Sequence, residues 1–314
     1  MRHLILTGAC YLDTILTVPH FPEEDSKLRA TSMQVRRGGN CPNTLEVLQQ
    51  LLPLSSHPPR AADEKDTEEV ITVTPHLIAC LPNAQSTATR KIKSSFAHAQ
   101  RRPDTPIVDL SRCLYRREHD EAASSYIIRS GQTGSRTIVN FNDLPDMTVA
   151  EFQDIADNFA REHGGNDNDC WWHFEGRIPD TTLRCIQYLR QAQPACTISV
   201  EVEKPGRQGL VELAAESDVV FYSRSWAEGA SALSLPSGEY MHCPANPSGK
   251  DILVVDTIGA GDTFIAGMLY GLICHNDDWS RREMLAFAVE LATSKVQRDG
   301  FAGLVAAQGC GLVI

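Results

Sequence analysis

The sequence predicts an α/β fold in which helices cover a central, mostly parallel sheet. Short apolar segments typical of buried strands alternate along the chain with amphipathic segments typical of helices. This alternation is characteristic of doubly wound α/β proteins. The chain has 314 residues, of which 42% are hydrophobic, so it is long enough to bury the core that such a fold requires. We therefore expect one domain spanning residues 1–314.

The predicted strands are short apolar or alternating runs bounded by turn-forming residues. They cover residues 4–8, 71–81, 124–130, 136–141, 170–174, 197–202, 218–223 and 252–255. The third and fourth of these runs are joined by a short segment that contains two glycines, which predicts a β-hairpin in an otherwise parallel scheme. We expect this hairpin to belong to a small β lid formed from about residues 11–37 and 124–141.

The predicted helices carry apolar residues at intervals of three and four. They cover residues 40–52, 148–163, 180–191 and 281–298. Pro42 is compatible with the first of these helices because amides in a first turn have no helical partner. In contrast, residues 53–69 are polar, charged and rich in proline, which predicts a disordered insertion at the surface.

The composition argues against several classes of protein. A net charge of −11 disfavours nucleic acid and anionic membranes as the main partners. No apolar run approaches the roughly 18 residues of a membrane span, and the first apolar run is expected to be a buried strand. The ten cysteines are scattered singly, without a C-x-x-C pair or a zinc-like spacing. This pattern indicates reduced, buried thiols and a cytoplasmic location.

The most informative segment covers residues 256–264 and has the sequence DTIGAGDTF. Its flanking apolar runs predict a strand, a glycine turn and the start of a helix. Gly259 and Gly261 allow backbone amides to converge on an anion, and the helix N-terminus adds positive potential. Asp262 follows directly. A carboxylate that accepts a proton beside a phosphate-binding turn is the minimum apparatus for phosphoryl transfer, while a carboxylate that only caps the helix is the alternative.

A second group of polar residues lies near the end of the first strand and the start of the first helix. Gly38, Gly39 and Asn40 open that helix, Asn43 follows, and Asp13 comes after the first strand. Ligands of α/β folds bind at such positions, and acidic and amide side chains suit a polyhydroxyl ligand. The alternative is an ordinary turn with an asparagine cap and a turn acid.

These two motifs resemble the signatures of the PfkB, or ribokinase-like, carbohydrate kinases. Further phrases resemble the ketohexokinase branch of that family: PEEDS at 22–26, GSRTIV at 134–139, FEGR at 174–177 and VEVEKP at 200–205. The likeness extends with gaps from about residue 3 to about residue 298. The sequence contains neither a Walker P-loop nor the protein-kinase motifs.

The resemblance implies a ribokinase-like three-layer sandwich and an ATP-dependent sugar kinase, with fructose O1 as the leading acceptor. It implies that Asp262 is the catalytic base and that Gly259, Ala260 and Gly261 hold the transferred phosphate. It also assigns Asp13, Gly39, Asn40, Asn43 and Arg136 to the sugar, Asp25 to a partner subunit's site, and Ala227, Glu228 and Gly229 to ATP. For Arg136 the alternative is a strand arginine with a solvated head.

The resemblance further implies that Mg²⁺ arrives with ATP, held mainly by phosphate oxygens and water. No residue of the chain is assigned as a metal ligand. We also expect a homodimer that forms through the lid.

One part of the sequence departs from the family pattern. Only Arg224 and Ser225 separate the phrase DVVFYS at 218–223 from WAEGA at 226–230, whereas the family has a helix and a strand there, roughly thirty residues in all. Parallel neighbours need a crossover of about a dozen residues or more. Either one strand replaces two, or the sequence comes from an incorrectly spliced transcript.

This departure leaves alternatives to a ketohexokinase-like enzyme. One is a PfkB kinase for another sugar, such as ribose. The other is a sugar-binding relic, or a mis-spliced chain, with impaired catalysis.

Overall fold

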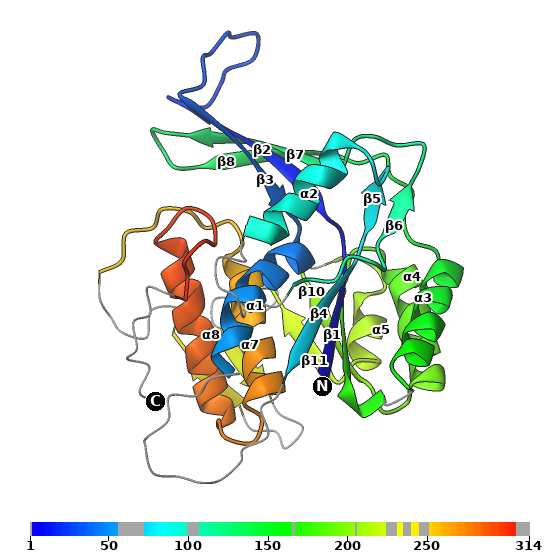
Figure 1. The fold of residues 1–314 in the computed structure, drawn as a ribbon. Coiled ribbons are helices and arrows are strands. Elements are labelled where there is room, and N and C mark those ends of the chain that lie inside the picture. Colours follow the sequence, from blue (N-terminus) through cyan, green and yellow to red (C-terminus); the bar gives the residue numbers. More distant parts are fainter. Residues whose placement is uncertain are drawn as a thin grey trace.

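The fold is built on a central parallel sheet with helices on both faces (Figure 1). The structure, a computed structural model, describes residues 2–55, 72–98, 107–164, 167–204, 206–223, 231–234, 240–244 and 251–305. The strand order of the central sheet is β11-β10-β9-β1-β4, and each adjacent pair is parallel. The α/β fold class predicted from the alternation of segments is therefore confirmed.

Most of the predicted strands are present, with ends that shift by one or two residues. The central sheet contains β1 (Arg2–Thr7), β4 (Val73–Ile78), β9 (Cys170–Glu175), β10 (Thr197–Val202) and β11 (Val219–Tyr222). The strand predicted at 71–81 is divided, because β4 ends before β5 (Cys80–Pro82), which pairs with β6 (Leu114–Arg116) in a separate small sheet.

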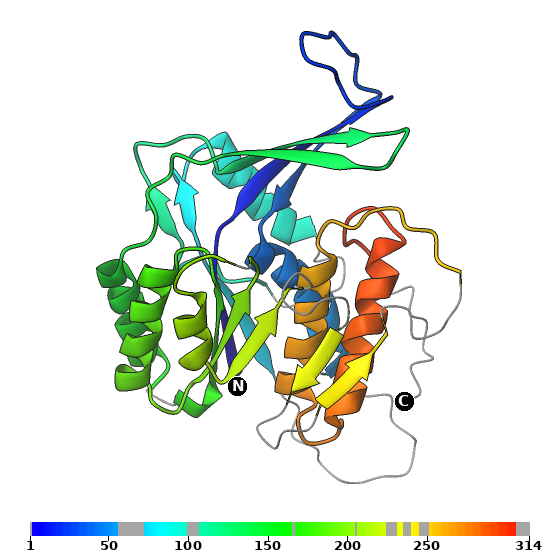
Figure 2. The same cartoon turned by 180° about the vertical axis from the view of Figure 1, so that it is seen from behind.

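Each face of the central sheet is covered by its own helices (Figures 1 and 2). One layer contains α1 (Asn40–Ser55), α7 (Ala260–Cys274) and α8 (Arg281–Val296), and the other contains α3 (Val149–Glu162), α4 (Pro179–Ala192) and α5 (Leu210–Ala215). Two separate clusters of buried apolar side chains lie beneath these layers. A further helix, α2 (Thr87–His98), packs against strands outside the central sheet.

Local sequence signals explain where several helices begin. Thr148 and Ser280 precede α3 and α8, and each makes a capping box with a glutamate three residues later, which satisfies two amides that would otherwise lack a partner. The start of α7 differs. Its N-cap is Gly259, which adopts the left-handed conformation and has no side chain to cap the helix.

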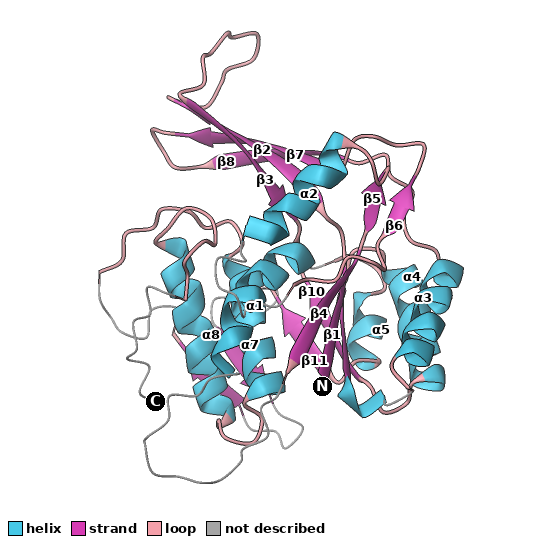
Figure 3. Ribbon diagram, in the orientation of Figure 1, coloured by secondary structure: helices cyan, strands magenta, loops and turns pink. Residues whose placement is uncertain are grey.

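A second, four-stranded sheet stands beyond one end of the central sheet (Figure 3). We call it the outer sheet; it contains β2 (Tyr11–Val18), β3 (Ser32–Gly38), β7 (Ser124–Ser130) and β8 (Arg136–Phe141) in the order β3-β2-β7-β8. The hairpin predicted between 124–130 and 136–141 is antiparallel, as expected. The outer sheet is formed by the residues that are predicted to belong to the lid.

The pairing register separates the side chains of the outer sheet into two faces. The inner face, which contacts the rest of the molecule, includes Asp13, Arg36 and Arg129. The opposite face is rich in exposed apolar side chains. They are Met33, Val35, Tyr126, Val139 and Phe141.

The strand predicted at 252–255 is wrong. These residues belong to no strand or helix, and Leu253 is 77% exposed. The physical reason is that the central sheet ends at β11 within the described residues, so the apolar run has no neighbouring strand to pair with. The next strands, β12 (Ser231–Ser234) and β13 (Tyr240–Cys243), instead form their own antiparallel hairpin.

The remaining expectations concern the insertion, the cysteines and membranes. Pro53 lies inside α1, so that helix extends into the predicted insertion, and residues 56–69 lie outside the described residues. All nine cysteines in the described part of the chain are free, and eight of them are buried. In the same part of the chain, no helix has the length and apolar character needed to cross a membrane.

Candidate active site

The glycine turn predicted at 259–261 forms the start of α7. Gly259 has φ of 78°, and its carbonyl oxygen accepts a hydrogen bond from the amide of Thr263 at 2.9 Å. A Cβ atom at Gly259 would lie 2.2 Å from Cζ of Phe301, so only glycine fits. Within the described residues the amides of Gly261 and Asp262 donate to no acceptor. These amides are available to an anion, as the first amides of a helix commonly are.

Asp262 lies buried in the first turn of α7 and is held by α1. Its Oδ2 accepts a hydrogen bond from Nδ2 of Asn43 at 2.8 Å. The hydroxyl of Thr44 donates to the carbonyl oxygen of Asp262 at 3.2 Å. Among the described residues nothing donates to Oδ1 of Asp262, so this oxygen is available to accept a proton.

The environment of Asp262 favours a proton acceptor that works near neutral pH. Burial raises the pKa of Asp262 to about 7, the hydrogen bond from Asn43 opposes this rise, and the charge of Glu175 adds to it. A pKa near the working pH is what general base catalysis requires. A carboxylate that only capped a helix would be exposed and would have a lowered pKa. The geometry therefore favours the catalytic interpretation over the capping one.

The start of α1 is shaped by a close backbone contact. Gly39 has φ of 103°, and a Cβ atom there would lie 2.2 Å from the carbonyl oxygen of Ala9, so this position requires glycine. One turn further, Oδ1 of Asn43 accepts a hydrogen bond from Arg37 at 3.1 Å, and Arg37 also pairs with Glu46. Arg37, which we did not predict as a site residue, thus orients the amide that contacts Asp262.

Asp13 lies within β2 and is buried, which excludes the turn-acid alternative. Burial raises its pKa, and a hydrogen bond with Ser125 on the neighbouring strand opposes the rise. The positive charge of Arg37 lowers the pKa of both Asp13 and Asp262. Arg37 donates to Asn43, which contacts Asp262, and a Cβ atom on the next residue, Gly38, would lie 2.2 Å from Oδ2 of Asp13. The two sequence motifs therefore meet at this point.

Two further buried acids lie at the carboxyl ends of β9 and β10. Oε2 of Glu175 accepts a hydrogen bond from the amide of Ala9 at 2.8 Å. Both carboxylate oxygens of Glu201 accept from Nδ2 of Asn40, at 3.0 and 3.1 Å. Burial raises the pKa of Glu201 well above its usual value, and the charges of Asp262 and Glu175 add to this rise. The two acids therefore help to set the electrostatics around Asp262.

In the sequence these two glutamates belong to phrases that resemble the family, FEGR and VEVEKP. No role is assigned to either of them from the sequence alone. Their position at the carboxyl end of parallel strands was the available signal, because ligands of α/β folds bind at that edge. Their burial was not visible in the sequence, where the alternating VEVEK pattern of residues 200–204 equally suited a charged surface strand.

The remaining predicted site residues lie in three different places. Arg136 lies at the start of β8, and its guanidinium donates to Oγ1 of Thr257 at 2.8 Å, so it contacts the segment before the glycine turn. Asp25 is exposed in the loop between β2 and β3, which projects away from the body of the molecule (Figure 1). Ala227, Glu228 and Gly229 lie outside the described residues.

Comparisons with known proteins agree with this geometry. The sequence pattern of the pfkB family carbohydrate kinases matches residues 227–304, which include the glycine turn and Asp262. Ketohexokinase from Mus musculus is 29% identical to the chain, with 97% of this chain and 99% of that protein covered. The chain is thus similar to the pfkB family of carbohydrate kinases over residues 227–304, and to a ketohexokinase over nearly its whole length. Its relatives indicate a phosphotransferase that acts on a sugar.

Solved structures of ribokinases share the fold of this chain. Ribokinase from Giardia lamblia is 14% identical, with a TM-score of 0.68 and coverage of 97% of this chain and 95% of that chain. Ribokinase from Arabidopsis thaliana, solved with ribose and ATP, is 15% identical, with a TM-score of 0.56 and coverage of 95% and 94%. The expected ribokinase-like fold is therefore confirmed.

The ketohexokinase alignment is longer than this chain. It runs over 342 positions, whereas this chain has 314 residues. At least 28 positions of the relative therefore have no counterpart in this chain. A gap of this total size is comparable to one strand-and-helix crossover of about 30 residues.

Proposed function

We propose that the chain transfers the γ-phosphoryl group of ATP to a hydroxyl of a small sugar, with fructose O1 as the leading acceptor. The observation that carries this proposal is the position of Asp262, a buried carboxylate with one oxygen held by Asn43. The amides of Gly261 and Asp262 beside it have no acceptor among the described residues. A base and an anion-binding turn in the same helical turn are what phosphoryl transfer to a hydroxyl requires.

In the proposed reaction the sugar hydroxyl donates its proton to Oδ1 of Asp262. The hydroxyl oxygen then forms a bond to the γ-phosphorus as the bond from that phosphorus to the bridging oxygen of ADP breaks. The amides of Gly261 and Asp262 face the charge that develops on the phosphoryl oxygens, and they need no reorganisation because the helix already fixes them. The buried surroundings of Asp262 exclude water, which would compete with the sugar.

The proposed sugar site lies between the outer sheet and α1. Asp13 projects from the inner face of the outer sheet, and Asn43 and Asn40 project from the first turn of α1. Carboxylate and amide side chains can accept hydrogen bonds from sugar hydroxyls, and the amides can also donate to them. The ketohexokinase relative favours fructose among the sugars that such a site accepts.

Mg²⁺ belongs to the proposal as a companion of ATP. Among the described residues, no group of three or more histidine, cysteine or acidic side chains has the geometry to hold a metal ion. The ion would therefore be bound chiefly through phosphate oxygens and water, where it would neutralise phosphate charge.

The test is an assay of ADP release by the purified protein with three acceptors, namely fructose, ribose and adenosine. We expect the highest kcat/KM for fructose. A preference for ribose or adenosine would replace the proposed acceptor and leave the reaction class intact. Absence of turnover with each of these and with a wider panel of sugars would contradict the kinase activity itself.

A second candidate is a sugar-binding protein that has lost catalysis, and a specific observation favours it. The central sheet ends at β11 within the described residues, and Leu253 and Val254 lie exposed in a segment that belongs to no strand. Among the described residues, the segment that leads into the glycine turn therefore has no strand beside it.

Calorimetric titration separates the two candidates. An active kinase binds fructose and a non-hydrolysable ATP analogue, and each ligand is expected to bind in the absence of the other. Binding of the sugar without binding of the nucleotide analogue would support the relic.

A further inference from the structure

Among the described residues, the segment that leads into the glycine turn has no neighbouring strand. Residues 251–257 belong to no strand, yet the turn that follows must be held within a fraction of an ångström for catalysis. Two backbone bonds contribute, because the amides of Val255 and Asp256 both donate to the carbonyl oxygen of Val296, at 2.7 and 3.1 Å. The other contacts come from side chains.

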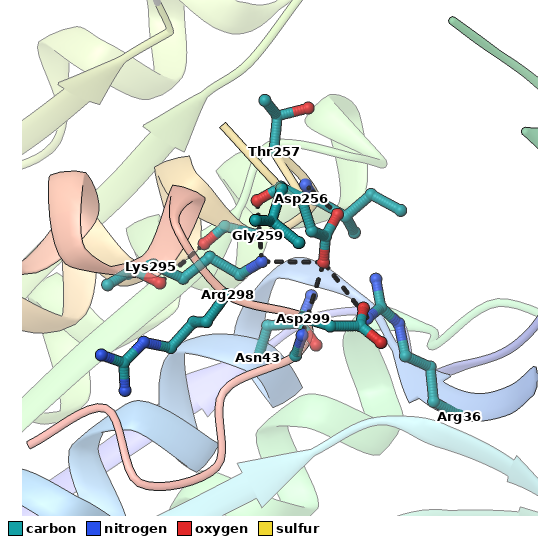
Figure 4. Close-up of polar contacts among 12 residues, drawn as sticks. Arg36, Asn43, Asp256, Thr257, Gly259, Lys295, Arg298 and Asp299 are labelled. Carbon is teal, nitrogen blue, oxygen red and sulfur yellow. Dashed lines mark hydrogen bonds and ion pairs between the residues drawn. The ribbon is translucent and has the colours of Figure 1, made fainter. Parts of the chain in front are cut away.

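Lys295 supplies the first of these side chains. It lies near the end of α8 and is fully buried. Its Nζ donates to the carbonyl oxygen of Asp256 at 3.0 Å and to Oδ2 of the same residue at 2.8 Å (Figure 4). Lysine is rarely buried to this extent unless it is paired. A buried lysine that reaches both the backbone and the carboxylate of one residue fixes the position of that residue.

Asp256 connects Lys295 to the residue that precedes the turn. While Oδ2 accepts from Lys295, Oδ1 accepts from the amide of Ile258 at 2.9 Å. Burial acts to raise the pKa of Asp256, but the hydrogen bonds from Lys295 and Ile258 outweigh it, so the pKa lies below its usual value. The carboxylate is thus ionised, and it links α8 to the residue directly before Gly259.

Arg36 of the outer sheet contacts the same carboxylate. Its Nη1 lies 3.4 Å from Oδ2 of Asp256 and 3.7 Å from a carboxylate oxygen of Asp299 (Figure 4). Other side chains of the outer sheet contact this region too, because Arg129 donates to the carbonyl oxygen of Val255 at 2.5 Å and Arg136 donates to Thr257. Arg36 is also the register partner of Asp13, the proposed sugar ligand.

We propose that Asp256, Lys295 and Arg36 form an ionic clamp that positions the phosphate-binding turn and couples it to the outer sheet. This inference rests on the proposed function, since it describes how the phosphate-binding turn is held. Lys295 fixes the turn from α8. Arg36 transmits the position of the outer sheet, so a sugar bound at Asp13 favours the arrangement in which the turn is held correctly. Both are positioning residues, because neither acts directly on the proposed reacting atoms.

The decisive variants separate positioning from simple stabilisation. Lys295→Met leaves the buried Asp256 carboxylate without its main partner and is expected to lower Tm. Combining it with Asp256→Asn removes both charges, and replacing both members of a buried ion pair commonly restores stability. If the clamp positions the turn, the double variant regains Tm but not kcat. Arg282→Met, which removes an exposed positive charge from the same helix, serves as the matched control.

For the double variant we expect kcat to fall by about 100-fold, the loss typical of a misplaced catalytic group, while KM for the sugar changes less than threefold. We also expect faster amide hydrogen exchange over residues 257–262 in this variant than in the wild type. Wild-type kcat together with wild-type exchange in a double variant that has regained its Tm would overturn the clamp.

Amide hydrogen exchange tests the clamp separately from the proposed function, because the measurement does not depend on enzymatic turnover. If the wild-type protein shows no turnover, the proposed function fails, and exchange over residues 257–262 still decides whether the clamp orders the turn. If both variants of Lys295 fail to fold, Arg36→Gln carries the test, because this side chain is 19% exposed and lies at the edge of the network. Faster exchange at the turn in Arg36→Gln supports the clamp, and unchanged exchange contradicts it.

Discussion

At the scale of single residues, the proposed chemistry depends on the protonation of Asp262. Its carboxylate must be ionised to accept a proton, and burial raises its pKa to about 7. We therefore predict that kcat/KM rises with pH and levels off above an apparent pKa near 7. The measurement is the initial rate of ADP release from pH 5.5 to 8.5. A rate independent of pH across this range would contradict the assignment of Asp262 as the base.

The same shift predicts how stability depends on pH. In the folded state Asp262 keeps its proton up to about pH 7, whereas in the unfolded chain it loses the proton near pH 3.8, the ordinary pKa of an aspartate side chain. The folded state thus binds more protons between these values, so this group contributes stability that is lost as pH rises through 7. We predict that Asp262→Asn raises Tm relative to the wild type more at pH 8 than at pH 5. An equal difference at both values would indicate that Asp262 carries no raised pKa.

At the scale of secondary structure elements, the start of α7 gives a pair of contrasting predictions. Gly259 has a positive φ, and an added Cβ atom would clash with the ring of Phe301. Gly259→Ala should therefore destabilise the fold by at least about 1–2 kcal/mol. It should also reduce activity, because the turn must move. Thermal unfolding and the ADP-release assay measure both effects. Wild-type values for both would show that the turn tolerates a side chain.

Gly261 gives the second, contrasting prediction for this turn. A Cβ atom there would meet no other atom within 4 Å, and alanine is favoured over glycine in a helix by about 0.5–1 kcal/mol. We predict that Gly261→Ala keeps or raises Tm but lowers activity at least about tenfold, because the methyl group occupies space that the proposal assigns to phosphate. Loss of stability without loss of activity would contradict this assignment.

The helices and strands also show which features can be predicted from the sequence and which cannot. Thr148 and Ser280 are capping signals that act locally, so the helices after them were predicted to within two residues. The run at 252–255 has the composition of a strand, but a strand also needs a neighbour, and β11 ends the described sheet. Glu201 and Lys295 were not assigned roles because their burial depends on contacts with residues distant in the sequence, Asn40 and Asp256.

At the scale of the whole molecule, the outer sheet presents an apolar face that the described chain leaves uncovered. Met33 is 67% exposed, Val139 is 59% exposed, and Tyr126 and Phe141 are about half exposed. Contiguous apolar surfaces of this kind commonly mark interfaces. We therefore propose that two copies of the chain pair through this face. This arrangement would direct the projecting loop that carries Asp25 toward the partner.

This proposal predicts a solution mass twice that of the 34.6 kDa chain, measured by light scattering during size-exclusion chromatography. Val139→Lys places a charge on the apolar face and should yield a monomer with unchanged secondary structure. A change at an exposed position outside the outer sheet, Val211→Lys in α5, is the control. A monomeric wild-type protein would exclude dimerisation through the outer sheet under those conditions.

The central claim is that Asp262 is the base of a sugar kinase, and one measurement tests it most directly. The initial rate of fructose-dependent ADP release is compared between the wild-type protein and Asp262→Asn, with Tm confirming that both are folded. We predict a rate lower by about 100- to 10,000-fold in the variant, the range attributed to general base catalysis. A variant that retains a rate close to that of the wild type would contradict the claim.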